Sequence, residues 1–245
     1  MSIARPAPRS TFSAKHMVLS VTRPPIGSRR TEATDRSQRP TGRAEDDLFY
    51  TGRGTDGVPA APNPGDAGWV VWIEGLPCSG KTTVARAVAD RLRSQGRAVE
   101  VLDGDEVRRM FSPELGFSRK DREGHARRVS YVARMLARHG VLVLVAMITP
   151  YETSRQAARA TVGERFSEVW LSCPVEVCRQ RDPKGLYRKD RAPGSSKVTG
   201  VDDPFEEPLN PELVLDTSAE PPAASVQRLL SYLAGAKIVA PIAAA

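Results

Sequence analysis

Residues 75–82, which read GLPCSGKT, fit the pattern G-x-x-x-x-G-K-[ST] in full. This pattern binds phosphate chains because its glycines let backbone N–H groups approach the oxygens closely. Its lysine, here Lys81, meets the β- and γ-phosphates, and its hydroxyl residue, here Thr82, faces Mg²⁺. We therefore predict a site for a nucleoside triphosphate with Mg²⁺ at this loop, rather than a glycine-rich turn without a ligand.

The residues on either side of this loop predict the elements that hold it. Residues 70–73 form an apolar run, as expected of a buried strand. Residues 83–93 are rich in alanine and place Val84, Val88 and Leu92 on one face of a helix. The amino end of that helix would direct the positive end of its dipole toward bound phosphates.

Two carboxylates, Asp103 and Asp105, follow the second predicted strand, residues 98–102. In an open α/β sheet, ligands collect at the carboxyl ends of the strands. One acid can orient metal-bound water or accept a hydroxyl proton while the other holds the substrate. The alternative is an Asp-Gly turn with solvated acids.

Basic and aromatic side chains follow the acidic pair. Guanidinium groups suit phosphate or sulfate oxygens, although charged helix faces are commonly just solvated. Phe117 belongs either to the core or to a stacking surface for a base. We interpret His125 and His139 as surface or capping residues rather than metal ligands. The arginines concerned are Arg108, Arg122, Arg127 and Arg128.

From Trp69 onward, strand and helix patterns alternate. Such alternation predicts an α/β fold with a parallel sheet and helices on both faces, a three-layer sandwich of the P-loop NTPase type. Ser118 with Asp121 resembles a capping box that starts a helix, and Gly140 would end it. The other predicted strands are residues 141–148, 168–173 and 213–215, and the other predicted helices are residues 154–162, 175–181 and 223–234. Residues 182–211 are polar and long for a loop, which is typical of a lid.

The composition is ordinary for a globular protein, with 40% hydrophobic and 27% charged residues in 245. Residues 1–67 carry 10 basic and 7 acidic residues, which leaves +4 of the net charge of +7 for the rest. No basic stripe is interleaved with aromatics and no apolar run approaches the roughly 18 residues of a membrane span, so we expect neither a nucleic-acid nor a membrane partner. The three cysteines point to a reducing, cytoplasmic location. Within the loop, Cys78 is either a small filler or a redox-sensitive thiol.

The composition also divides the chain. Residues 1–67 are rich in Arg, Pro, Ser, Thr and Gly, which predicts a disordered arm and linker before a domain over residues 68–236 and a tail over residues 237–245. No acid precedes Glu32, so the arm resembles an organellar transit peptide in composition. A flexible arm, or a true start at Met17, explains the same facts.

Several motifs together resemble the adenylylsulfate kinase family, from Trp69 to about Leu233. They are the loop at residues 75–83, LDGD at 102–105, LGFS at 115–118, DR at 121–122, ITPY at 148–151, RDPKGLY at 181–187, TGVDDPFE at 199–206 and NPELVLDT at 210–217. The resemblance implies ATP-dependent, Mg²⁺-assisted phosphorylation of the ribose 3′-hydroxyl of adenosine 5′-phosphosulfate. The product would be 3′-phosphoadenosine 5′-phosphosulfate. Members of this family often form homodimers.

The resemblance also implies roles for individual residues, with Phe117 stacked on the acceptor's adenine and the segment around Arg181 as a mobile lid. The catalytic residues would be Lys81, Asp103 and Thr149, and the metal would lie at Thr82 and Asp103. ATP would be held by Gly75, Leu76, Pro77, Cys78, Ser79, Gly80, Lys81, Thr82, Thr83 and Arg181. The acceptor would be held by Asp105, Arg108, Phe117, Arg122, His125, Ile148, Thr149, Lys184 and Val198.

Departures from the family pattern cluster in the acceptor half. Glu106 and His125 stand where the family usually has asparagine, and Thr149 stands where it has serine. Lys197-Val198 replaces a usual Gly-Phe, and loss of that aromatic face should weaken base binding by about 1 kcal/mol or more. The alternative function is therefore a related P-loop kinase with a pocket re-tuned to another small hydroxyl compound or nucleotide. Other classes are a regulatory nucleotide-binding module without catalysis and a nucleic-acid binder that acts through its basic arm.

Overall fold

The computed structural model describes residues 68–183, 185–187 and 197–240. The described residues leave out the arm over residues 1–67, Lys184 and residues 188–196 of the predicted lid, and residues 241–245 of the tail.

Five parallel strands form one sheet in the order β2-β3-β1-β4-β5. They are β1 (Trp69–Glu74), β2 (Val99–Asp103), β3 (Leu142–Ala146), β4 (Phe166–Ser172) and β5 (Leu213–Asp216). Because all pairs are parallel, the carboxyl ends of the strands meet at one edge of the sheet and their first residues at the other. The loop predicted to bind phosphate therefore leaves the central strand at the edge where ligands collect.

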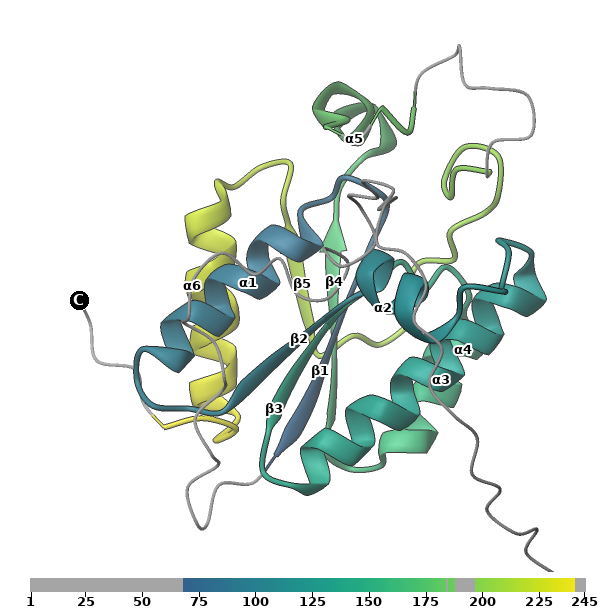
Figure 1. Ribbon diagram of the computed structural model, residues 1–245. Coiled ribbons are helices and arrows are strands. Elements are labelled where there is room, and N and C mark those ends of the chain that lie inside the picture. The colour runs from purple at the N-terminus through teal and green to yellow at the C-terminus, as the bar shows by residue number, and fades with distance from the viewer. Residues whose placement is uncertain (1–67, 184, 188–196, 241–245) are drawn as a thin grey trace, which may run out of the picture. The chain divides into compact units, whose positions relative to one another are not determined.

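Helices cover both faces of the sheet, as Figure 1 shows. They are α1 (Lys81–Arg93), α2 (Gly104–Phe111), α3 (Arg119–Arg138), α4 (Glu152–Val162), α5 (Val175–Arg181) and α6 (Pro222–Gly235). α1 and α6 pack on the face that carries Val71 and Ile73, and α3 packs with α4 on the face that carries Val70 and Trp72. Alternate residues of one strand are thus buried on opposite faces, which is why these strands read as unbroken apolar runs.

The predicted α/β class and three-layer architecture are confirmed. The capping predicted at Ser118 is confirmed too, because its hydroxyl oxygen accepts a hydrogen bond from Asp121 N at 3.2 Å and the hydroxyl donates to Asp121 Oδ2 at 2.6 Å. The predicted strand over residues 141–148 was too long, since β3 ends at Ala146. The packed chain also extends past the boundary expected at residue 236, because Ile238 and Val239 are buried in the core with α1 and α6.

The start of α4 shows how a distant residue sets a helix boundary. The helix begins at Glu152, two residues before the predicted start. The side chain of Tyr151, the N-cap residue, makes no capping hydrogen bond. Instead, Glu152 N donates to the carboxylate of Glu206 at 2.7 Å, and Glu206 N donates to Pro150 O at 2.8 Å. The segment before β5 therefore holds the amino end of α4.

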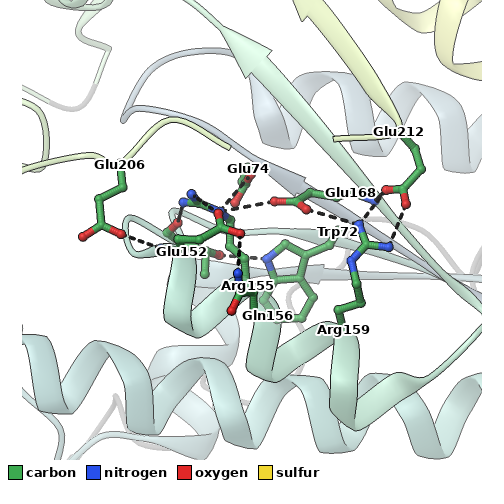
Figure 2. A network of polar contacts seen from close by, with 10 residues as sticks. Trp72, Glu74, Glu152, Arg155, Gln156, Arg159, Glu168, Glu206 and Glu212 are labelled. Carbon is green, nitrogen blue, oxygen red and sulfur yellow. Dashed lines mark hydrogen bonds and ion pairs between the residues drawn. The ribbon is translucent and has the colours of Figure 1, made fainter. Parts of the chain in front are cut away.

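A cluster of buried charges lies between α4 and the sheet (Figure 2). The side chain of Arg155 is fully buried, and its Nε lies 3.5 Å from Glu74 Oε1 and 3.2 Å from Glu168 Oε1. Its Nη2 donates to Glu152 Oε2 at 2.6 Å and its Nη1 to Thr149 O at 2.8 Å. Burial and then the neighbouring Glu168 raise the pKa of Glu74 well above its usual value. Because Glu74 immediately precedes Gly75, this cluster fixes the strand end from which the loop departs.

No helix among residues 68–183, 185–187 and 197–240 is long and apolar enough to cross a membrane.

Candidate active site

Residues 75–82, which we call the phosphate loop, fold tightly between β1 and α1. Gly75 has a φ of 144° and passes so close to β4 that a Cβ atom there would lie 2.6 Å from Leu171 O, so only glycine fits. Cys78 has a positive φ of 64°, which is uncommon for a residue other than glycine. Its Sγ lies 3.9 Å from Asp182 Oδ1 of the segment that follows α5. The loop is thus shaped by contacts with the strand and with that segment.

Lys81 lies beneath the loop with its ammonium group turned back onto loop oxygens. Its Nζ donates to Leu76 O at 2.6 Å and to Gly75 O at 3.0 Å. Burial lowers the pKa of Lys81 to about 8, because the charged form is poorly solvated there. Phosphate oxygens in the cleft would therefore compete with backbone carbonyls for this group.

Thr82 and Asp103 bring a hydroxyl and a carboxylate together at the start of α1 and the end of β2. The Thr82 hydroxyl donates to Asp103 Oδ2 at 2.6 Å. Asp103 is also the N-cap of α2, since its Oδ1 accepts from Asp105 N at 3.0 Å and from Glu106 N at 3.4 Å. Sequence patterns missed α2, because the Asp-Gly pair resembled a turn. These oxygen donors fit Mg²⁺, which takes one or two protein oxygens together with phosphates.

One cleft of about 610 Å³ opens over the phosphate loop at the carboxyl edge of the sheet. One wing is formed by α2, α3 and the end of β3, and the other by α5 and the start of α6. Predicted site residues in its lining are Pro77, Cys78, Ser79, Gly80, Lys81, Thr82, Thr83, Asp103, Asp105, Arg108, Phe117, Arg122, His125, Ile148 and Arg181. The structure therefore brings most of the predicted triphosphate and acceptor residues into one space.

In the first wing, an aromatic ring lies close to two arginines. Phe117 is 44% exposed, and its ring centre lies 4.9 Å from Arg108 Cζ and 5.5 Å from Arg122 Cζ. Burial, and then the charge of Arg122, lowers the pKa of Arg108. Arg108 Nη1 donates to Gly116 O at 2.8 Å, which fixes its direction. The ring is thus a solvent-facing platform flanked by cations rather than a core residue.

His125 lies deeper in the same wing and is 2% exposed. Its Nδ1 lies 3.0 Å from the hydroxyl of Ser112, while its Nε2 has no hydrogen-bond partner among the described residues. Burial, and then the charge of Arg108, lowers the pKa of His125 to about 4, so the ring is neutral near pH 7. The interpretation of His125 as a surface or capping residue was wrong.

In the second wing, several contacts join the phosphate loop to α5 and the end of β5. The Thr217 hydroxyl donates to Ser79 O at 2.9 Å, and the Tyr187 hydroxyl donates to Pro77 O at 3.0 Å. The guanidinium of Arg181 donates to Thr217 O. Sequence patterns assigned no role to Thr217, although its position at the carboxyl end of a parallel strand was a usable signal.

Four of the predicted site residues that the structure describes are not part of the cleft lining. One is Gly75 at the base of the loop, and the others are Leu76, Thr149 and Val198. The Leu76 side chain lies against Gly200, and Val198 is buried at the start of a turn. Thr149 is 1% exposed, and its hydroxyl accepts a hydrogen bond from Trp72 Nε1 at 2.8 Å. Thr149, predicted as a catalytic residue, therefore lies in a buried contact outside the cleft lining of the described residues.

The changed acceptor positions do not act alike. Glu106 is exposed on α2 and Val198 is buried elsewhere, so of Glu106, His125 and Val198 only His125 lines the cleft in the described chain. Lining residues that sequence patterns did not single out are Met147, Leu186, Thr217, Glu220, Pro222 and Ser225.

The chain is similar to several known proteins. Residues 67–216 match the model of the adenylylsulphate kinase family. The chain is 52% identical over 156 residues to an adenylyl-sulfate kinase of Synechococcus sp. (strain JA-3-3Ab), an overlap of 64% of this chain and 88% of the relative. It is 46% identical over 173 residues to an adenylyl-sulfate kinase of Rippkaea orientalis (strain PCC 8801 / RF-1), 68% of this chain and 95% of the relative.

A solved structure agrees with this result. The chain resembles the Mycobacterium tuberculosis APS kinase CysC in complex with AMPPNP and APS, with a TM-score of 0.65 and 40% sequence identity over 68% of this chain and 98% of that chain. Since the family model matches more than half of the chain and spans all five strands, the chain belongs to the adenylylsulphate kinase family.

Proposed function

We propose that this protein transfers the γ-phosphoryl group of ATP to the ribose 3′-hydroxyl of adenosine 5′-phosphosulfate. The products are ADP and 3′-phosphoadenosine 5′-phosphosulfate. The observation that carries the proposal is one shared cleft, in which the phosphate loop and Asp103 adjoin a pocket where Phe117 lies close to Arg108 and Arg122. A triphosphate suits the first part, and a base with an anionic phosphosulfate suits the second.

The roles follow from position and charge. Lys81 leaves the carbonyls of the loop to meet the transferred phosphoryl group, and Asp103 accepts the proton of the attacking hydroxyl. Arg108 and Arg122 hold the acceptor's anionic group, while Phe117 stacks on its adenine. Thr82 and Asp103 would hold Mg²⁺, which supplies positive charge against the phosphates when bound.

The test is release of ADP by the full chain with Mg-ATP, with and without adenosine 5′-phosphosulfate, and with Lys81→Ala as the control. Strong stimulation by the acceptor that Lys81→Ala abolishes is the expected result. ATP binding without stimulation would contradict the proposal and would favour a pocket re-tuned through His125 to another hydroxyl compound. ADP formation that never depends on an acceptor would also contradict it.

Phe117→Ala should raise the KM for the acceptor by about tenfold and leave the KM for ATP unchanged. The ring is half exposed, so its loss removes stacking on a base, roughly 1–3 kcal/mol, without opening a core cavity. Steady-state kinetics with each substrate varied in turn would measure both constants. Phe111→Ala is the matched control, because Phe111 is 47% exposed on α2 and outside the cleft lining of the described residues. An unchanged KM for the acceptor in Phe117→Ala would contradict the proposal that Phe117 stacks on the base.

The affinity for a non-hydrolysable ATP analogue should fall as the pH rises through about 8. Burial holds the pKa of Lys81 at about 8, so above that pH the ammonium must regain a proton before it can meet a phosphate. The dissociation constant should then rise by up to about tenfold per pH unit, which calorimetric titration can follow. In Lys81→Met, binding should be weaker and independent of pH in this range. A wild-type constant that stays flat between about pH 7 and about pH 9 would contradict the role of Lys81.

We also propose that the protein works as a homodimer in the cytoplasm. The homodimer follows from the resemblance to the family, and the location follows from the cysteine content of the chain. Sedimentation equilibrium of the full chain and localisation of a tagged copy would test the two proposals separately.

A further inference from the structure

We infer that the contact between Gly200 and Leu76 couples the acceptor pocket to the phosphate loop, so that ATP and the acceptor tighten each other's binding. The inference rests on the proposed function for the identity of the two ligands. It assigns a positioning role to two residues that stand outside the cleft lining of the described chain.

Residues 198–203 form a compact turn. Val198 O accepts hydrogen bonds from the backbone N–H groups of residues 201, 202 and 203, and Gly200 N donates to Asp203 O at 2.7 Å. Val198 N donates in turn to the carboxylate of Asp202 at 2.8 Å. With this many internal hydrogen bonds, the turn moves as one unit.

Arg122 joins the turn to the acceptor pocket. Arg122 lines the cleft and flanks Phe117, yet its Nη2 also donates to Lys197 O at 3.3 Å and lies 3.9 Å from Asp203 Oδ2. One guanidinium is therefore shared between the cleft and the turn. An anion in the cleft would draw Arg122 away from Asp203 and Lys197.

A contact between Gly200 and Leu76 joins the turn to the phosphate loop. Gly200 has a φ of +87°, and a Cβ atom there would lie 2.5 Å from Leu76 Cδ2, so the turn rests directly on the Leu76 side chain. The carbonyl of Leu76 accepts from Lys81 Nζ at 2.6 Å. Lys81 is thus a second shared cation, on the phosphate-loop side of the contact between Gly200 and Leu76. A triphosphate would draw Lys81 away from Leu76.

Positive coupling follows from this arrangement. Each ligand takes a cation away from the unit formed by the turn and the phosphate loop, and so loosens the same contact. Binding of the first ligand includes the free energy needed to loosen the contact between Gly200 and Leu76. Binding of the second ligand does not, because the contact is already loose. If Leu76 lacked the side chain that the turn rests on, the two events would become independent.

The first test measures the dissociation constant of a non-hydrolysable ATP analogue with and without saturating adenosine 5′-phosphosulfate, and then the reverse pair. In the wild type, each ligand should tighten the other by the same factor, at least about fivefold. In Leu76→Ala that factor should fall to about twofold or less, whatever the individual constants are. A wild type without coupling, or a Leu76→Ala variant that keeps the wild-type factor, would overturn the inference.

A double-mutant cycle tests the contact itself. Gly200→Ala should lower turnover by about fivefold or more, and Leu76→Ala/Gly200→Ala should return to the level of Leu76→Ala alone. Gly96→Ala is the matched control, because Gly96 has a φ of +80° with nothing within 4 Å of an added Cβ atom, so it has the backbone strain without the clash. Additive effects, or a Gly200→Ala variant that behaves like Gly96→Ala, would overturn the inference. Failure of the wild type to turn over adenosine 5′-phosphosulfate would instead refute the proposed function.

Discussion

Asp103→Asn should lower turnover by about 10³-fold while the protein remains folded. Asparagine keeps an oxygen that can cap α2 at the N–H groups of Asp105 and Glu106, so the helix should lose less than about 1 kcal/mol. What it removes is the carboxylate oxygen that now accepts the Thr82 hydroxyl at 2.6 Å. That oxygen is the one we propose as proton acceptor and as the neighbour of Mg²⁺. Turnover with both substrates saturating, together with the thermal midpoint, would measure the two effects.

Two further variants separate charge from capping at this position. Asp103→Ala removes both functions, so it should match Asp103→Asn in turnover but lose about 1 kcal/mol more stability. Glu106→Gln changes an exposed carboxylate on the same helix, outside the cleft lining of the described residues, and should retain wild-type turnover. Turnover of Asp103→Asn within about tenfold of the wild type would show that this carboxylate is not the base.

Arg155→Met should lower the free energy of unfolding by about 3–5 kcal/mol, because it leaves the buried Glu74 without its cation and removes one of the two cations beside Glu168. Arg155 has a fully buried side chain and lies among Glu74, Glu152 and Glu168, as Figure 2 shows. Methionine fills similar space, so most of the loss should come from uncompensated charge rather than from a cavity. Urea unfolding at neutral pH would measure the change.

Arg159→Met provides the matched control on the same helix. Arg159 is partly exposed and pairs with Glu212 at 2.7 Å and with Glu168 at 3.2 Å. Exposed ion pairs contribute little, so its loss should cost about 1 kcal/mol or less. Equal losses from the two variants would mean that burial does not set the energy of this cluster.

Local patterns predicted those parts of the site whose structure is determined by the residues of one short stretch. The phosphate loop is such a stretch, because glycines, a lysine and a hydroxyl residue at fixed spacing lie between an apolar strand and an amphipathic helix. Asp103 was predicted for a similar reason, since it ends a strand in a parallel sheet. Its second role, as the cap of α2, was missed because the Asp-Gly pair also fits a turn.

The parts that could not be predicted depend on residues far apart in the chain. The amino end of α4 is capped by Glu206, 54 residues away, so no local signal marks that start. The hydroxyl of Thr149 accepts from Trp72, 77 residues away, and this contact turns a predicted catalytic residue into a buried structural one. By contrast, burial of His125 could have been predicted, because it lies four residues before Val129 on the same side of α3.

The parallel sheet has a practical consequence for protein engineering. The cleft lies at the carboxyl edge of the strands, whereas β1 begins at Trp69 at the opposite edge, and α6 runs from the cleft lining toward that same edge before Val239 enters the core. A fluorescent reporter, a surface-immobilisation tag or a second enzyme fused before residue 68 or after residue 240 would therefore be attached on the side remote from the reaction. Such fusion proteins should bind both nucleotides as tightly as the unfused protein does.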